Sequence, residues 1–352
     1  MLSFYKDKRV FITGHTGFKG SWLCRILLLA GAQVTGFALE PTKDQLALFE
    51  AAGIEKNMRS IYGDIRDFSA LKTAFEEAKP EIVFHLAAQP IVKDGYARPV
   101  YTYETNVMGT VHLLECARLA GCVRSFVNVT TDKVYDNREL SRGYHENDLL
   151  DGFDPYANSK SCSEMVTHCY IRSFFADSAM AVSTARAGNV IGGGDFAPFR
   201  IVPDCVRALK DGSAIVLRNP HSVRPYQHVL EALGAYLLIA ERQYHDPGLA
   251  GSYNVGPEES DCITTGRVAD LFIQACSGAI QRIDMPEGNA VHEASFLRLD
   301  VSKLKSRLGW KPRWHVSQAI QRTVEWSQCC FSGGNTERCM DEQIADYFSF
   351  EI

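Results

Sequence analysis

The sequence predicts an α/β fold with a doubly wound parallel sheet and a smaller C-terminal substrate-binding region. Short apolar runs typical of buried strands alternate with helical patterns up to about residue 190, and such alternation indicates parallel strands joined by helices. After that point, prolines and scattered arginines separate short apolar runs. We therefore predict a sheet domain over residues 1–190, to which later segments can return, and a cap region over residues 191–352.

The composition is that of an ordinary globular protein. Hydrophobic residues make up 46% and charged residues 22%, and the net charge of -5 gives no basic signal for nucleic acid. No apolar run approaches the roughly 20 residues that span a bilayer, and the polar residues 1–8 lead into a strand without a secretory signal. The 11 cysteines form no CxxC pair, so we interpret them as reduced thiols, expect a cytoplasmic location and predict no metal site.

The first strand pattern, Arg9–Thr13, ends in a glycine-rich turn with the sequence GHTGFKG at residues 14–20, and an apolar helix follows. In a GxxGxxG turn between strand and helix, glycines permit a tight bend and let backbone N–H groups approach a pyrophosphate. The segment therefore predicts a Rossmann-type dinucleotide site, with a closely packed turn as the alternative.

The second predicted strand, Gln33–Leu39, gives little information on the choice between NAD and NADP. An NAD site usually has an acid at the end of this strand for the ribose hydroxyls. Here the end is Ala38, with Glu40 two residues further on and no arginine for a 2′-phosphate. Glu40 favours NAD, but ribose recognition stays unexplained.

The third and fourth predicted strands, Ser60–Ile65 and Glu81–Gln89, supply further candidate contacts. Asp64 can hydrogen-bond an adenine amino group, or it can be a helix N-cap or turn residue. The fourth strand ends in small residues, across which a cofactor can lie. We interpret His85 inside it as a packed strand histidine rather than a ligand.

A helical pattern over Val100–Ala120 precedes the fifth strand, Ser125–Thr131. Thr131, Asp132 and Lys133 lie at its carboxyl end, where doubly wound sheets bind their ligands. A solvated turn is the alternative interpretation.

The segment DPYANSK at residues 154–160 predicts a helix that carries Tyr156 and Lys160 one turn apart on one face. A free phenol has a pKa of about 10 and is a weak base at neutral pH, but a nearby ammonium favours the phenolate. The pair can then take a proton from a sugar hydroxyl. The alternative is a surface helix with an incidental tyrosine and lysine.

The sixth strand, Ala181–Arg186, precedes GNVIGGG at residues 188–194, which indicates a loop near a ligand or a hairpin turn. In the cap region, Arg218 and Arg224 can bind a diphosphate through forked hydrogen bonds.

These motifs together resemble the extended short-chain dehydrogenase/reductase family of NAD-dependent epimerases and dehydratases, over about residues 8–325. Segments 13–20, 130–135, 188–195 and 224–229 more narrowly resemble the CDP-glucose branch of the sugar-nucleotide 4,6-dehydratases. That branch has Asp-Lys where this chain has Asp132-Lys133, whereas the dTDP-glucose branch has Asp-Glu and the 4-epimerases lack the pair.

The resemblance implies an internal redox cycle on bound NAD, which converts CDP-D-glucose to CDP-4-keto-6-deoxy-D-glucose and water in deoxysugar biosynthesis. Tyr156, with Lys160 and Thr131, would remove the proton of the hydroxyl on carbon 4. Lys133 or a bound water would remove the proton on carbon 5, and Asp132 would protonate the departing hydroxyl. Asp132 must then be protonated, with a raised pKa, and Lys133 must be neutral.

The resemblance also implies two sets of binding residues. Cofactor contacts are expected from Gly14, His15, Thr16, Gly17, Phe18, Lys19, Gly20, Asp64, Ile65, Leu86, Ala87, Ala88, Asn106, Tyr156 and Lys160. Substrate contacts are expected from Gln89, Asn189, Arg218, Arg224, Gln227 and Arg298. Gln227 and His228 are equally well explained as cap-packing residues.

Dimerisation through the helices at 100–120 and 156–175 is a further expectation, although packing on the sheet explains their apolar positions equally well. Two other functions remain open: another nucleotide-sugar 4-epimerase or dehydratase of the same fold, and a non-catalytic sensor of dinucleotides.

Overall fold

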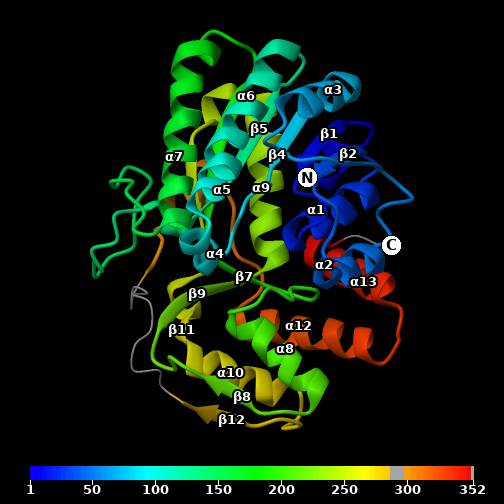
Figure 1. The fold of residues 1–352 in the computed structure, drawn as a ribbon, viewed down its shortest axis with the longest axis vertical. Helices are drawn as coiled ribbons and strands as arrows, with labels where there is room; N and C mark the ends of the chain where they lie inside the picture. The colour runs from blue at the N-terminus through cyan, green and yellow to red at the C-terminus, as the bar shows by residue number, and fades with distance from the viewer. Residues whose placement is uncertain (286–296, 350–352) are drawn as a thin grey trace.

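The computed structural model describes residues 1–285 and 297–349. Its centre is a seven-stranded sheet in which every pairing is parallel (Figure 1). In spatial order the strands are β3 (Arg59–Tyr62), β2 (Gln33–Ala38), β1 (Arg9–Thr13), β4 (Ile82–His85), β5 (Ser125–Thr131), β6 (Ala181–Ala187) and β10 (Ser252–Val255). The predicted doubly wound α/β fold is confirmed.

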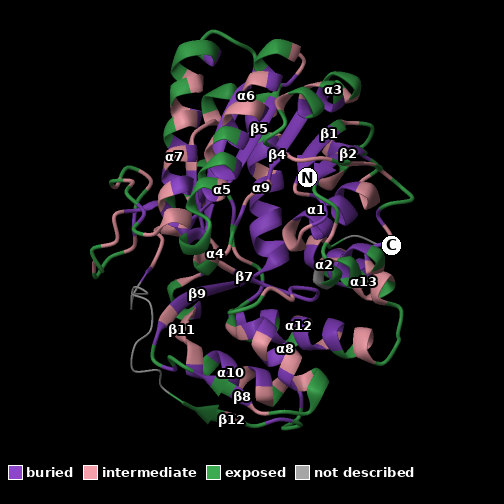
Figure 2. Cartoon of the chain, in the orientation of Figure 1, coloured by how far each residue is buried: buried purple, intermediate pink, exposed green. Residues whose placement is uncertain are grey.

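Alternate residues of the central strands face two separate apolar cores. On β1, Val10 and Ile12 belong to the core with the helices α1 (Phe18–Leu29), α2 (Lys43–Ala51), α9 (Val229–His245) and α13 (Thr336–Phe348). Phe11 belongs to the core with α3 (Phe68–Ala78), α6 (Gly109–Ala120) and α7 (Pro155–Tyr170). Figure 2 shows α9 buried along most of its length, as expected for a helix between the sheet and other helices.

Three predicted elements differ from the structure. β3 ends at Tyr62 and β4 at His85, so both strands are shorter than predicted. β4 ends at His85 because Gly14 turns the neighbouring chain away from the sheet after β1. The N–H of Ala87 then donates to the side-chain hydroxyl of Thr13 instead of to a backbone carbonyl of a strand. The predicted helix Val100–Ala120 consists of α5 (Pro99–Tyr103), a π-helical segment (Glu104–Met108) and α6.

The smaller part of the molecule contains two short sheets and a third apolar core (Figure 1). Its strands are β7 (Asn189–Ile191), β8 (Ile215–Leu217), β9 (Val223–His228), β11 (Cys262–Thr264) and β12 (Arg282–Asp284), and its core helices are α8 (Ile201–Asp211), α10 (Thr265–Ala275) and α12 (Val316–Phe331). The remaining α-helices of the described residues are α4 (Val92–Ala97) and α11 (Ser302–Leu308), and a second π-helical segment (Ile171–Phe175) continues α7. Because β10 pairs with β6, the chain returns to the large sheet after residue 190; the two-part division itself stays a prediction.

All 11 cysteines are free thiols. Within residues 1–285 and 297–349, no helix has both the length and the apolar character needed to cross a bilayer.

Candidate active site

Helix α7 carries Tyr156 and Lys160. The Asp154 carboxylate caps the helix by accepting a hydrogen bond from the N–H of Ala157 at 3.0 Å, and Pro155 occupies the first helical position, where a missing N–H costs nothing. Lys160 is buried, and its Nζ donates to the carbonyl oxygen of Val129 on β5 at 3.0 Å. The helix start therefore lies beside the carboxyl end of β5.

Thr131, Asp132 and Lys133 lie at that end of β5, where the chain enters a 3-10 turn formed by Asp132–Val134. The Thr131 hydroxyl donates to Asp132 Oδ1 at 3.0 Å and accepts from the N–H of Lys133 at 3.4 Å. Burial raises the pKa of Asp132 above its usual range, and the charge of Lys133 opposes this only in part. A raised pKa favours the protonated form of a carboxyl group, which is the form that a general acid requires.

Thr131 relates Asp132 to Tyr156, because its hydroxyl donates to Asp132 and its side chain also lowers the pKa of the Tyr156 phenol. Burial outweighs the effect of Thr131 and raises the pKa of Tyr156. We expected the Lys160 ammonium to favour the phenolate. In the folded chain the burial of the phenol dominates instead, because a buried phenolate loses its hydration.

Lys160 itself has a perturbed pKa. Burial, reinforced by the charge of Lys19, lowers the pKa of Lys160 to about 8. Lys19 in the glycine loop shows the same effect, with its pKa lowered to about 8 by burial and by the charge of Arg200. Two ammonium groups with lowered pKa values thus influence one region of the site.

The glycine loop has the geometry of a pyrophosphate cradle. Gly14 has a φ of +77°, and a Cβ there would lie 2.8 Å from the N atom of Ala87; a Cβ on Gly20 would lie 2.1 Å from the Gly14 carbonyl oxygen. These two glycines are needed for packing. A Cβ on Gly17, by contrast, would have only the Gly14 carbonyl oxygen nearby, at 3.5 Å. Gly17 is the N-cap residue of α1 and makes no side-chain capping bond. The first-turn N–H groups of α1 lack intrahelical acceptors, so the loop fits an anion such as a pyrophosphate.

His15 and Thr16 of this loop point to other parts of the chain. His15 is fully buried, and its Nε2 hydrogen-bonds with the Ser60 hydroxyl at 2.7 Å, while Nδ1 has no partner among the described residues. The Thr16 hydroxyl donates to the carbonyl oxygen of Leu39 at 3.0 Å. Both side chains therefore connect the glycine loop to the ends of β2 and β3.

Asp64 does not cap a helix, because Asp67 is the N-cap of α3, but it is a turn residue as the other alternative predicts: its Oδ1 accepts from the N–H of Arg66 at 2.9 Å. Asp64 forms an ion pair with Arg66 at 2.7 Å, so an adenine amino group would share this carboxylate with a guanidinium. Ile65 packs so closely on α6 that a Cβ on Gly109 would lie 2.8 Å from its side chain.

Gln89 and Asn106 hold the segment after β4 against the π-helical segment and α7. The N–H of Gln89 donates to Asn106 Oδ1 at 2.8 Å, and Asn106 Nδ2 donates to the Ser159 hydroxyl at 2.9 Å. His85 is buried, and its two ring nitrogens bond with the hydroxyls of Thr13 at 2.7 Å and Thr110 at 3.0 Å, so the prediction of a packed strand histidine is confirmed.

The predicted substrate residues come from several elements of the cap. Asn189 begins β7 and is in register with Tyr226 on β9, which also carries Arg224. Arg298 pairs with Glu259 and donates to the carbonyl oxygen of Ser141 at 3.3 Å.

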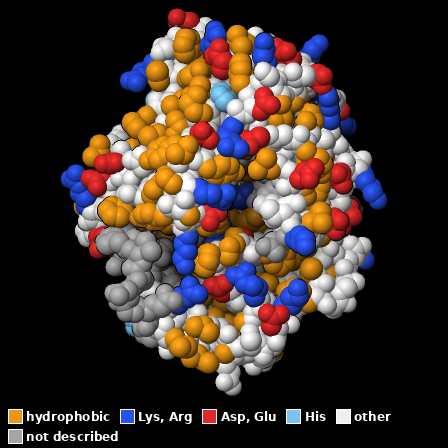
Figure 3. All heavy atoms as spheres, viewed as in Figure 1, with side chains coloured by type: hydrophobic (Ala, Val, Ile, Leu, Met, Phe, Trp, Pro, Cys, Tyr) orange, Lys and Arg blue, Asp and Glu red, His pale blue; other side chains and the backbone are white. Residues whose placement is uncertain are grey.

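Gln227 and Arg218 differ in exposure. Gln227 is buried and donates to the carbonyl oxygen of Val255 at 3.0 Å, and Arg218 is exposed. His228 is buried and caps α9, which confirms the packing interpretation for it. Figure 3 shows Lys and Arg side chains gathered around a hollow between the large sheet and the cap.

Two charged residues near the site were missed as candidates. Arg200 forms an ion pair with the buried Asp195 at 3.5 Å, and its charge acts on Tyr156 and Lys19. Asp195 directly follows the glycine run at 192–194, which was the available sequence signal. Arg200 has no distinctive local pattern, so only the fold reveals its position.

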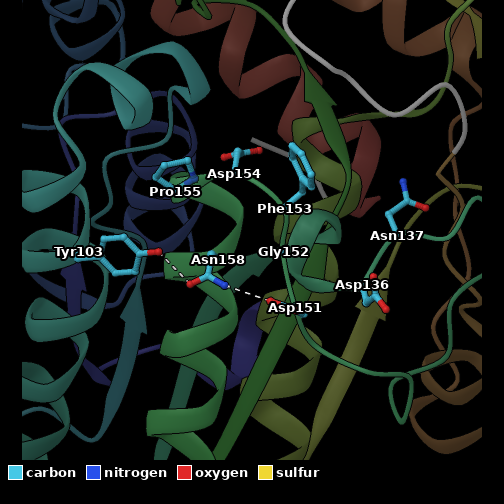
Figure 4. Close-up of a pocket in the computed structure, with 9 residues that line it drawn as sticks. All are labelled: Tyr103, Asp136, Asn137, Asp151, Gly152, Phe153, Asp154, Pro155 and Asn158. Carbon is cyan, nitrogen blue, oxygen red and sulfur yellow. Dashed lines mark hydrogen bonds between the residues drawn. The ribbon is translucent and has the colours of Figure 1, made fainter.

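A pocket of about 470 Å³ lies beside the N-terminus of α7 (Figure 4). It is lined by Tyr103, Asp136, Asn137, Asp151, Gly152, Phe153, Asp154, Pro155 and Asn158. Asn158 accepts from the Tyr103 hydroxyl at 2.9 Å and donates to Asp151 at 3.2 Å. The predicted catalytic residues do not line this pocket, so it is separate from the region of Thr131 and Tyr156.

Among the described residues, no cluster of His, Cys, Asp and Glu is arranged to hold a metal ion.

Residues 11–323 match the GDP-mannose 4,6 dehydratase family. The chain belongs to this family. A CDP-glucose 4,6-dehydratase of Salmonella typhimurium is 44% identical to this family member, over 99% of the chain and 98% of the relative. The predicted resemblance to epimerases and dehydratases of the short-chain dehydrogenase/reductase type is confirmed.

Solved structures agree with this family assignment. A UDP-glucose 4-epimerase from Thermus thermophilus in complex with NAD is 26% identical, with a TM-score of 0.76 over 92% of this chain and 99% of that chain. A dTDP-glucose 4,6-dehydratase from Bacillus anthracis in complex with NAD has a TM-score of 0.76 at 22% identity, over 91% of this chain and 96% of that chain, and shows the shared fold.

Proposed function

We propose that this protein is a CDP-glucose 4,6-dehydratase that forms CDP-4-keto-6-deoxy-D-glucose and water with the help of NAD. The observation that carries the proposal is the position of Thr131, whose hydroxyl donates to Asp132 and whose side chain also lowers the pKa of Tyr156. It places the phenol that would take the proton of a hydroxyl near a carboxyl group whose raised pKa suits it to expelling water. The 44% identity with the Salmonella enzyme supports the same reaction and the same nucleotide.

NAD supplies, when bound, the acceptor and later the donor of the hydride. The cradle at residues 14–20 would hold its pyrophosphate, because Gly17 leaves space at the N-terminus of α1 and the half-buried Lys19 adds a positive charge. Lys160 would contact the nicotinamide ribose. A positively charged nicotinamide would also favour the Tyr156 phenolate against the effect of its burial.

The chain's own residues then move protons. The Tyr156 phenolate takes the proton of the hydroxyl on carbon 4, and Thr131 hydrogen-bonds the same oxygen. Lys133 takes the proton on carbon 5, which the new ketone has made acidic, and Asp132 gives its proton to the hydroxyl on carbon 6, which leaves as water. Lys133 then gives its proton back to carbon 5 while the hydride would return to carbon 6, and the proton gained by Tyr156 replaces the one lost by Asp132. The cofactor would end in its original state, so no second substrate is consumed.

The cap would bind the nucleotide and diphosphate of the substrate. Asn189 and Arg224 lie on two different strands, Arg298 lies outside the helices and strands, and Arg218 is exposed directly after β8. Several guanidinium groups can therefore contact phosphate oxygens. Gln89 and Gln227 would act mainly by holding the loops around the sugar, since both side chains bond to the protein itself.

A homodimer through α5, α6 and α7 is part of the proposal. Large apolar side chains are exposed on these helices and the π-helical segments that continue them: Val100, Tyr103, Met108, Met165 and Phe174. Figure 3 shows apolar side chains over this part of the surface. Burial of such a patch against a second copy would stabilise the dimer.

The 11 free thiols support a location in a reducing compartment such as the cytoplasm.

The test is to incubate the protein with NAD and, in separate reactions, with CDP-glucose, dTDP-glucose, GDP-mannose and UDP-glucose. Mass spectrometry then identifies a product that has lost one water. Product from CDP-glucose alone supports the proposal. Product from another nucleotide keeps the chemistry but refutes the assignment of the nucleotide. A sugar epimer without loss of water would favour the second candidate, a 4-epimerase, which the similarity to the Thermus structure motivates.

A further inference from the structure

A buried ion pair connects α7 and β6 next to the turn that carries Asp132. Glu164 on α7 and Arg186 on β6 are both fully buried. Arg186 Nε and Nη2 donate to the two carboxylate oxygens of Glu164 at 3.0 and 2.9 Å. Glu164 lies one helical turn after Lys160, yet no proton transfer in the proposed mechanism uses either member of the pair.

Each member of the ion pair also binds a residue that flanks the turn formed by Asp132–Val134, Thr130 two residues before it and Tyr135 directly after it. Glu164 Oε1 accepts a hydrogen bond from the Thr130 hydroxyl at 2.5 Å, and Thr130 comes directly before Thr131. Arg186 Nη1 donates to the Tyr135 hydroxyl at 2.8 Å, and Tyr135 comes directly after the turn. The Arg186 guanidinium also lies 5.1 Å from the centre of the Tyr135 ring. A single ion pair therefore holds the turn at both ends.

Further bonds leave this network with little freedom to move. Glu164 Oε2 accepts a hydrogen bond from the Thr184 hydroxyl at 2.6 Å. The Tyr135 hydroxyl donates to Asn254 Oδ1 on β10 at 2.6 Å. Because every one of these side chains is buried, the turn cannot shift without breaking bonds that water does not replace.

The stability of the fold alone does not explain this arrangement. Taking two charges out of water costs so much that apolar side chains of similar volume often replace a buried ion pair without loss of stability. The bonds from Glu164 and Arg186 to Thr130 and Tyr135 do have a clear consequence, since they fix the Asp132 turn relative to the helix of Tyr156.

We propose that Glu164 and Arg186 are positioning residues, which fix the acid/base turn of Asp132 and Lys133 relative to Tyr156. The inference rests on the proposed function. Neither residue touches the substrate in this scheme, so their loss should reduce the rate of the chemical steps and leave the affinity for substrate almost unchanged. Elimination of water should suffer more than oxidation at carbon 4, because the turn carries the acid and base of that later step.

The experiment compares two double variants that each remove one buried ion pair. Glu164→Leu/Arg186→Met removes the pair at the turn. Arg25→Met/Asp341→Leu is the matched control, since Arg25 on α1 and Asp341 on α13 form another buried ion pair, outside the turn network. Thermal unfolding, KM for CDP-glucose, kcat and the NADH formed in a single turnover are measured for both.

We expect the first variant to fold, to keep its KM and to lose kcat by roughly 10- to 100-fold, the size of effect that a misplacement of about 1 Å produces. NADH should accumulate during its single turnover. The control should keep the wild-type kcat. A first variant with wild-type kcat, or an equal loss of kcat in the control, overturns the inference.

If the first variant does not fold, the single variant Arg186→Lys tests the same positioning role. An ammonium keeps the charge but lacks the forked geometry that reaches both Glu164 and Tyr135. A fall in kcat at constant KM supports the positioning role, and an unchanged kcat refutes it. Failure of the proposed function is distinguishable, because the wild-type protein would then release no 4-keto-6-deoxy product.

Discussion

The ammonium nitrogen of Lys160 donates a hydrogen bond to the carbonyl oxygen of Val129 at 3.0 Å. This bond joins α7, which carries Tyr156, to β5, which ends two residues later at Thr131. Lys160 therefore has two tasks in the proposed enzyme, one electrostatic and one geometric, and a substitution there affects both.

Lys160→Met should lower kcat by roughly 10²- to 10⁴-fold, the range typical of lost general acid–base assistance. Burial lowers the pKa of Lys160 to about 8. Above that pH the side chain is neutral and no longer favours the Tyr156 phenolate, so wild-type kcat should fall on the alkaline side, and the variant should lack this fall. Rates of NADH formation in a single turnover, measured from neutral to alkaline pH, check this; an identical alkaline fall in the variant would contradict it.

Asp132→Asn should stop the loss of water and leave the oxidation at carbon 4. Burial raises the pKa of Asp132, so its protonated form persists to higher pH than usual, and wild-type dehydration should decline as pH rises through that pKa. The same shift means that Asp132 stabilises the fold least at high pH, so the gain in unfolding temperature from Asp132→Asn should grow with pH. Thermal unfolding at several pH values, together with product analysis, tests both parts.

Lys133→Met should also separate the two stages. Without the amine, the proton on carbon 5 has no base, while Tyr156 still takes the proton of the hydroxyl on carbon 4. We expect NADH to form and remain bound, with at least a roughly 100-fold loss of dehydration. Absorbance of NADH and mass spectrometry of the sugar distinguish the stages. Dehydration at near wild-type rate would assign this proton to another base, such as a bound water.

Gly17→Ala and Gly20→Ala should separate cofactor binding from packing. A Cβ on Gly17 meets only ordinary contact at 3.5 Å, so the fold should tolerate it, but the methyl group would occupy space needed by the pyrophosphate. A Cβ on Gly20 would lie 2.1 Å from a backbone oxygen, so the free energy of unfolding should fall by about 1–3 kcal/mol. NAD titrations and thermal unfolding check the pair; equal NAD affinity in Gly17→Ala and wild type would refute the cradle.

Asp154→Ala should affect both stability and activity. Asp154 is the N-cap that fixes the start of α7, and Tyr156 lies only two residues after it. Asp67→Ala is the matched control, since Asp67 caps α3 with an equivalent bond of 3.0 Å to Ala70. Each substitution should lower the free energy of unfolding by about 1 kcal/mol. Only Asp154→Ala should lower kcat. Equal kcat in the two variants would show that the cap does not orient Tyr156.

Local sequence patterns were sufficient to predict the strands and the residues at their ends. Apolar runs identified β1, β2, β5 and β6 closely, because a strand buried on both faces needs continuous apolar residues. The glycine spacing marked the α1 turn, and the order of strands and helices placed Thr131, Asp132 and Tyr156 at one edge of the sheet. These features depend on neighbours along the chain, which a sequence displays directly.

The tertiary structure alone decided which residues of different helices, strands and loops interact with one another. The bond between Gln89 and Asn106, the closeness of Arg200 to Tyr156, and the return of β10 to the sheet all join residues far apart in the chain. The Glu164–Arg186 ion pair is of the same kind. Burial likewise raised the pKa of Tyr156, an effect that spacing along a helix does not reveal. A sequence records which groups are available, but desolvation and long-range bonding depend on the three-dimensional packing around each group.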